Sequence, residues 1–116
     1  LNSQAYNQYK VSVEVDERTL HEIYLPAFEA AIQRGGAMAA MAAYNKVRGL
    51  WCTESPYLLD TLLRDELGFD GLVVSDWNAV HNTERTALCG MDVEMEQASK
   101  KMGNMLSINI IWPILY

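Results

Sequence analysis

Cysteine is scarce in this sequence, which contains only Cys52 and Cys89. Two cysteines so far apart supply no disulfide framework, and they lack the close spacing that marks a zinc site. We therefore expect both to be buried free thiols. No other motif points to a metal ion or a cofactor, and none is expected.

Basic residues are also few, with nine Lys and Arg against fifteen Asp and Glu, which gives a net charge of −6. Nucleic-acid binding needs clustered Lys and Arg to neutralise phosphates, so this scattered set argues against it. Long apolar runs are missing as well. The run Ile108–Tyr116 is about half as long as a membrane-spanning helix. The composition thus predicts neither a nucleic-acid nor a membrane partner.

The start of the chain carries no targeting signal. The segment Leu1–Lys10 is polar and has no apolar core of the kind that a secretory signal contains, so the sequence sets no cellular location. The chain has 116 residues, half of them hydrophobic and 21% charged. These values are typical of a globular chain with at most one domain.

A long amphipathic helix is predicted at Asp16–Arg34. Asp16 can cap its free amide groups, and Gly35–Gly36 supplies its end. Pro26 lies inside the helix and should bend it, because proline removes one backbone hydrogen bond. The apolar residues that recur on one face are Leu20, Ile23, Tyr24, Ala27, Phe28, Ala31 and Ile32.

A second helix is predicted at Pro56–Leu67, with Ser55 as its N-cap. It is followed by the apolar run Gly71–Ser75, which has the composition of a strand covered on both faces in a parallel sheet. A further helix at Asn82–Cys89 and a short strand at Met91–Met95 complete the pattern. The buried stripe expected on the second helix consists of Leu59, Leu62, Leu63 and Leu67.

The small-residue segment Ala37–Tyr44 is ambiguous, because Ala and Met favour helices by intrinsic propensity. If strands and helices alternate along the chain, this segment must be a strand. Such alternation predicts an α/β fold with a parallel sheet.

Two short polar segments follow the predicted strands, where parallel α/β barrels hold their working residues. The first is Tyr44-Asn45-Lys46, and the second is Ser75-Asp76-Trp77. A carboxylate there can act as a nucleophile or base, and an indole can stack on the apolar face of a sugar ring. The alternative is that Asp76 caps the next helix while Trp77 packs under a loop.

Four segments together resemble the β-glucosidases of glycoside hydrolase family 3. They are Asp16–Phe28, Ala43–Val47, Leu67–Trp77 and Gly90–Met95, in the order that the family shows. The resemblance covers roughly Leu1 to Glu96. It implies a (β/α)8 TIM-barrel-like domain, of which this chain holds only the later units, because such barrels need about 250 residues.

The resemblance also implies roles for four residues. Asp76 falls on the catalytic nucleophile of a retaining hydrolase, and Trp77 falls on the wall of the glucose subsite. Tyr44 is expected against the nucleophile, and Met41 is a weaker candidate for lining the pocket. The family's general acid/base Glu and other groups of the sugar pocket are expected outside this sequence.

Several hypotheses about the function of the chain remain open. The first is a fragment of a β-glucosidase, residues 1–96, followed by an unmatched tail at 97–116. A β-xylosidase or an N-acetylhexosaminidase of the same family is the runner-up, although Trp77 argues against the latter. A third hypothesis is a non-catalytic α/β fragment. Because a partial barrel leaves strand edges unpaired, self-association through those edges is also expected.

Overall fold

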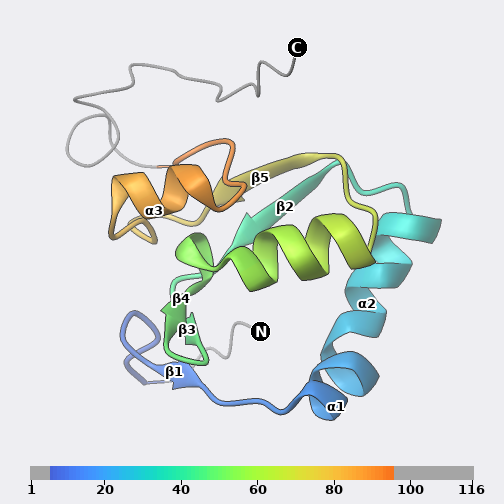
Figure 1. The fold of residues 1–116 in the computed structure, drawn as a ribbon, viewed down its shortest axis with the longest axis horizontal. Coiled ribbons are helices and arrows are strands. Elements are labelled where there is room, and N and C mark those ends of the chain that lie inside the picture. The colour runs from blue at the N-terminus through green and yellow to red at the C-terminus, as the bar shows by residue number, and fades with distance from the viewer. Residues whose placement is uncertain (1–5, 96–116) are drawn as a thin grey trace.

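The computed structural model describes residues 6–95. Within this range, the fold consists of two small sheets, a long helix, a short 3-10 helix η3 (Cys52–Glu54) and two further helices (Figure 1). The tail expected at residues 97–116, together with its boundary at Glu96, lies outside the described residues.

The first helix alternates α-helical and π-helical turns. Asp16 caps it as predicted, because its carboxylate accepts hydrogen bonds from the Thr19 amide at 2.8 Å and the Thr19 hydroxyl at 2.9 Å. Pro26 lies at the start of an α-helical turn, where its missing amide hydrogen falls at a change of helix type. Gly36, with φ of 64°, follows the end. The turns are α1 (Glu17–Thr19), η1 (Leu20–Tyr24), α2 (Leu25–Glu29) and η2 (Ala30–Arg34).

The apolar face of this helix is present but largely exposed. Leu20 is fully buried, whereas Ile23 is 68% exposed and Phe28 is 45% exposed. Hydrophobic spacing identifies a face that another element could cover, and it does not say which element does so. Within residues 6–95, most of this face stays in contact with solvent.

Two of the three predicted strands exist, and they pair in parallel. β2 (Ala39–Ala42) lies beside β5 (Leu72–Ser75) along its whole length. The ambiguous small-residue segment is therefore a strand, and the alternation of strand, helix and strand is confirmed. The prediction that β5 is covered on both faces is only partly right. Val73 is fully buried, but Leu72 is 43% exposed because it lies at the start of a two-stranded sheet.

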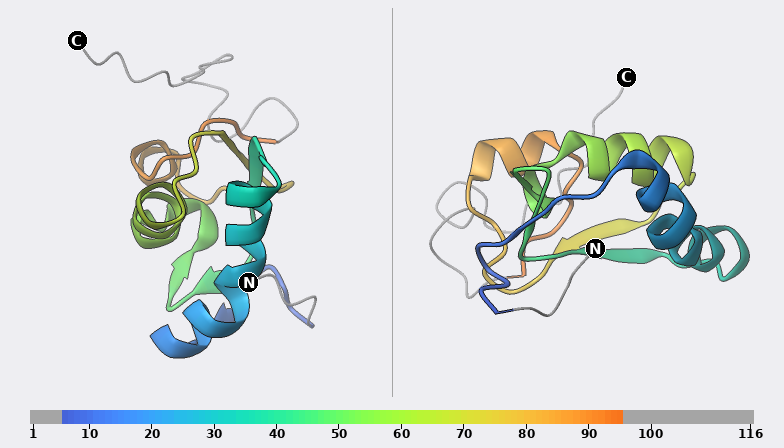
Figure 2. Two further views of the ribbon diagram at one scale, coloured as in Figure 1. Left: turned by 90° about the vertical axis from the view of Figure 1, so that its right-hand side faces the viewer. Right: turned by 90° about the horizontal axis from the view of Figure 1, so that it is seen from below.

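The second helix, η4 (Tyr57–Glu66), is a π-helix that connects β2 to β5. Ser55 caps it, because its hydroxyl accepts a hydrogen bond from the Leu58 amide at 3.3 Å. The predicted leucine stripe is buried, and Leu59, Leu63 and Leu67 form one core with Val73 and the two free cysteines. Figure 2 shows η4 and the last helix, α3 (Thr83–Leu88), on the same side of the β2–β5 pair.

A small hairpin between the two parallel strands was not predicted. It consists of β3 (Lys46–Val47) and β4 (Leu50–Trp51), and β1 (Ser12–Val13) pairs with β3 in parallel. Arg48 and Gly49 form its two-residue turn with φ of 51° and 83°. Positive φ at both positions is the geometry that matches the twist of a tight hairpin.

The last helix is close to its prediction, and the last strand is not. α3 (Thr83–Leu88) is capped by Asn82, whose side-chain oxygen accepts from the Arg85 amide at 2.9 Å. The strand expected at Met91–Met95 is reduced to one parallel bridge between Val93 and Val74. Backbone groups of this segment instead form hydrogen bonds with the end of β5.

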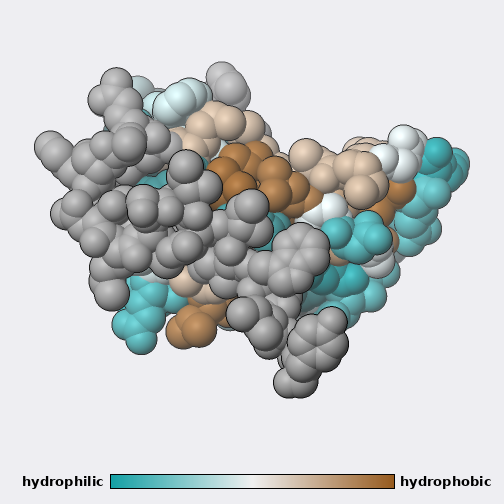
Figure 3. All heavy atoms as spheres, turned by 90° about the horizontal axis from the view of Figure 1, so that it is seen from above, coloured by the Kyte–Doolittle hydropathy of each residue, from teal (hydrophilic) through white to brown (hydrophobic). Residues whose placement is uncertain are grey.

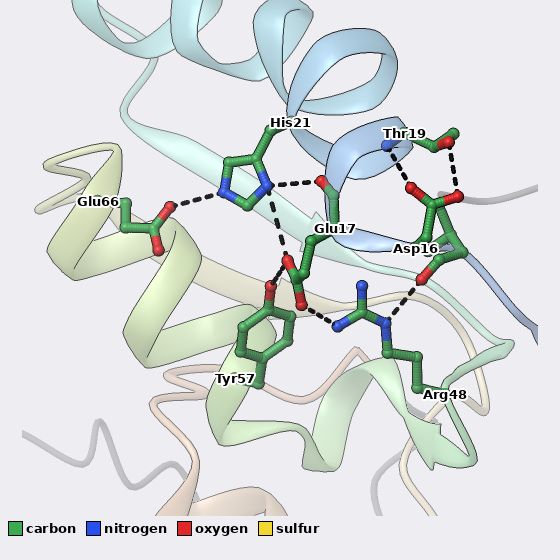
Figure 4. A network of polar contacts seen from close by, with 8 residues as sticks. Asp16, Glu17, Thr19, His21, Arg48, Tyr57 and Glu66 are labelled. Carbon is green, nitrogen blue, oxygen red and sulfur yellow. Dashed lines mark hydrogen bonds and ion pairs between the residues drawn. The ribbon is translucent and has the colours of Figure 1, made fainter.

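A polar network joins the first helix, the hairpin turn and η4 (Figure 4). Glu17 lies at its centre, where it pairs with Arg48 and accepts a hydrogen bond from the Tyr57 hydroxyl at 2.6 Å. His21 contacts the Glu17 carbonyl at 2.8 Å and the Glu66 carboxylate at 3.2 Å. The network thus ties together segments that are far apart in the sequence.

This network predicts a pH-dependent contribution of His21 to stability. The hydrogen bonds to the Glu17 carbonyl and then to Glu66 raise the pKa of His21 above its usual value of 6.5. The contribution is therefore complete below about pH 6.5 and is lost as pH rises through the higher pKa of the folded state. Urea unfolding of the wild type and of His21→Gln should give a free-energy difference that shrinks with rising pH. A difference independent of pH would contradict this.

Candidate active site

The two polar segments predicted from the sequence lie at the same edge of the β2–β5 sheet. Ala42 pairs with Ser75 at the carboxyl ends of the strands. The Asp76 amide donates a hydrogen bond to the Ala42 carbonyl at 2.9 Å. Parallel pairing therefore brings Tyr44 and Asp76, which are distant in sequence, to adjacent strand ends.

Tyr44 and Asp76 are in direct contact. A hydrogen bond to the Asp76 carboxylate, followed by burial and the charge of Asp76, raises the pKa of Tyr44 to about 12. The phenol is therefore protonated at neutral pH and donates its hydrogen to the carboxylate. The Tyr44 ring also packs against Tyr9, with ring centroids 4.6 Å apart. The prediction that these two side chains lie together agrees with this geometry.

The Asp76 carboxylate is held from its own loop as well. Its Oδ1 atom accepts a hydrogen bond from the Trp77 amide at 2.7 Å. The Trp77 side chain is 52% exposed, so its indole does not pack under a loop. Nor does Asp76 cap a helix, because α3 begins later and takes Asn82 as its cap. Both parts of the alternative interpretation are thus disfavoured.

Met41 lies within β2 and not in the loop that follows it. It is opposite Val74 in the sheet register, two positions before Asp76, and its side chain is 55% exposed. It also lines an apolar cavity of about 120 Å³ between the first helix, β2 and η4. The structure thus brings Tyr44 and Trp77 next to Asp76, and Met41 only to the same sheet.

The end of β5 is anchored from the segment that follows α3. The Ser75 hydroxyl accepts a hydrogen bond from the Met95 amide at 2.9 Å. Asp92 accepts from the Val73 amide at 2.7 Å and from Arg64 at 2.9 Å. Asp92 therefore holds the strand that carries Asp76.

Sequence reasoning missed the contacts that the hairpin makes with the loop after Asp76. His81 lies in this loop and stacks on Trp51 with ring centroids 3.7 Å apart. The Thr53 hydroxyl donates to the Ala79 carbonyl at 3.0 Å. No local pattern could have revealed these pairs, because their members are more than 25 residues apart in the chain.

Among residues 6–95, no three His, Cys, Asp or Glu side chains gather in a way that could hold a metal ion. No helix in the same range is long and apolar enough to cross a membrane.

Comparisons with known proteins identify the family to which the chain belongs. The sequence profile of the glycosyl hydrolase family 3 N-terminal domain matches residues 4–104. A β-glucosidase of Rhizobium radiobacter is 45% identical over 105 residues, which is 90% of this chain and 13% of that protein. A β-glucosidase of Bacteroides ovatus is 46% identical over 95 residues, or 82% of this chain and 13% of the relative.

A solved structure gives the same result. The β-D-glucoside glucohydrolase of Trichoderma reesei superposes with a TM-score of 0.79 at 44% identity, covering 82% of this chain and 13% of that one. The chain thus spans about an eighth of the length of the proteins it matches. The chain belongs to glycosyl hydrolase family 3, and its α/β fold is part of the TIM-barrel-like N-terminal domain of that family.

Proposed function

We propose that this chain supplies the catalytic nucleophile and part of the glucose-binding subsite of a retaining β-glucosidase. One observation carries the proposal. The Tyr44 phenol donates to the Asp76 carboxylate where two parallel strands end, beside the exposed indole of Trp77. This is the edge at which barrel enzymes place their reacting groups.

In the proposed reaction, the Asp76 carboxylate attacks the anomeric carbon of a β-linked glucosyl unit. A Glu from outside the described residues protonates the leaving oxygen as the glycosidic bond breaks. Water then hydrolyses the covalent glycosyl ester with help from the same Glu, now acting as a base. The two carboxyl groups of such enzymes lie about 5–5.5 Å apart.

The neighbours of Asp76 have separate tasks in this scheme. Tyr44 and the Trp77 amide donate to the carboxylate and fix its direction before the attack. The exposed face of the Trp77 indole stacks on the sugar ring. Met41 contributes apolar surface at the edge of the subsite, and the substrate is a β-glucoside or a β-linked oligosaccharide.

A panel of chromogenic substrates tests this proposal. A protein that joins this sequence to the remaining barrel and acid/base domain should cleave an aryl β-glucoside faster than the matching β-xyloside or N-acetyl-β-glucosaminide. A preference for the xyloside or the N-acetyl sugar would replace the β-glucosidase assignment by another one within the family. No activity on any of the three would favour the non-catalytic interpretation.

Self-association of the chain by itself stays a prediction. Within the described residues, β2 pairs with β5 alone, so one edge of β2 is unpaired. Hydrophobic side chains also reach the surface (Figure 3), and Met38, Met41 and Leu72 are each more than 40% exposed. Unpaired edges and exposed apolar residues both promote contact between copies.

A further inference from the structure

The loop that follows β5 reverses direction directly after the proposed nucleophile. Trp77 and Asn78 are exposed, whereas Ala79 and Val80 are almost completely buried. Asn78 has φ of 60°, in the left-handed region that asparagine adopts more readily than most residues with a side chain. The loop thus turns sharply between the exposed and the buried pair.

Thr53 contacts this loop from beneath. Its side chain is fully buried, and its hydroxyl donates to the Ala79 carbonyl at 3.0 Å. The Ala79 amide in turn donates to the Asp76 carbonyl at 3.2 Å. Two successive hydrogen bonds thus connect the Thr53 hydroxyl to the backbone of the proposed nucleophile.

The segment around Thr53 contacts both halves of the site. Trp51 stacks on His81 at the far end of the same loop, with the rings inclined by 20°. The Cys52 amide donates to the Asn45 carbonyl at 3.1 Å, directly after Tyr44. One short stretch of chain therefore fixes the loop of Asp76 relative to the loop of Tyr44.

We propose that Thr53 is a positioning residue for Asp76. By holding the turn from Asp76 to Ala79, its hydroxyl keeps the carboxylate where the Tyr44 phenol can donate to it. The consequence for catalysis rests on the function proposed above, whereas the effect on the Tyr44–Asp76 contact does not. The competing view is that Thr53 only satisfies a buried carbonyl and stabilises the fold.

The experiment is carried out on the full chain and monitors the hydrogen bond between Tyr44 and Asp76. Tyrosine labelled with ¹³C at Cζ gives a resonance for each phenol, and Tyr44→Phe identifies the one of interest. Its chemical shift at neutral pH reports the hydrogen bond, and its titration reports the pKa. Asp76→Asn defines the signal when the charged acceptor is lost.

Thr53→Val keeps the shape of the side chain and removes its donor. We expect this variant to move the Tyr44 resonance toward that of Asp76→Asn and to lower the pKa of Tyr44 from about 12 toward 10. Thr86→Val is the matched control, because Thr86 is equally buried and its hydroxyl has no hydrogen-bond partner within residues 6–95. It should leave Tyr44 unchanged.

Two results would overturn the proposal. One is a folded Thr53→Val chain with an unchanged Tyr44 resonance, and the other is an equal shift in Thr86→Val. Should the valine variant fail to fold, Thr53→Cys decides, because a thiol is a weaker donor of similar volume. An intermediate Tyr44 shift supports the positioning role, and a wild-type resonance contradicts it. Neither measurement depends on turnover, so both remain valid if the proposed glucosidase activity fails.

Discussion

Replacing Asp76 by Asn is expected to lower kcat by about 10³-fold or more in a protein with the complete barrel and acid/base domain. A loss of about 10³-fold corresponds to about 4 kcal/mol of activation free energy. The amide has the shape of the carboxylate but no charge, so it cannot form the glycosyl ester. Steady-state hydrolysis of an aryl β-glucoside measures the loss.

The control for this prediction is Asp70→Asn. Asp70 is an exposed carboxylate in the turn before β5, six residues upstream of Asp76. Its replacement removes the same charge at the opposite end of β5 and should leave turnover close to that of the parent protein. Near-normal turnover in Asp76→Asn, or an equal loss in both variants, would contradict the role assigned to Asp76.

The second large effect concerns the 116-residue chain without additional domains. We expect it to hydrolyse aryl β-glucosides at least about 10²–10⁴-fold more slowly than complete family members, the usual contribution of a positioned acid/base group. The Asp92 carboxylate already accepts hydrogen bonds from the Val73 amide and from Arg64, which leaves it poorly placed to act as a general acid. Comparable turnover would mean that a carboxylate of this chain has taken the acid role, with Glu94 as the first residue to test.

Much of the fold could be predicted because its signals are local. Asp16 and Asn82 are caps that act within three residues. The leucines of η4 recur at helical spacing and are buried. The strand at Ala39–Ala42 needed an additional argument, because its composition favours a helix. The alternation of elements resolved that ambiguity correctly, since parallel pairing requires a strand there.

The remaining features could not be predicted because they depend on contacts between distant segments. The strands of the hairpin are two residues long, too short for any periodicity to appear. Arg48 adopts a positive φ, which the sequence does not predict for an arginine. The exposure of Ile23 and Phe28 depends on which elements lie beside the helix. The spacing of apolar residues along the helix does not contain that information.

The candidate site also contains residues that the sequence could identify and one that it could not. Asp76 and Trp77 could be located because they directly follow an apolar strand, and the family resemblance added Tyr44. The role of Thr53 could not be predicted, because its hydrogen-bond partner is the backbone of a residue 26 positions away. A side chain that acts through a carbonyl of another loop becomes visible only once the fold brings the two together.

The central claim is that Asp76 forms a covalent bond to the sugar. The most direct measurement is mass spectrometry of the peptides released after a slow 2-fluoro β-glucoside has reacted with the complete protein that carries this sequence. We expect the mass of the fluorosugar on the peptide that contains Asp76, and no label in Asp76→Asn. A label on a peptide without Asp76, or a label that persists in Asp76→Asn, would contradict the assignment.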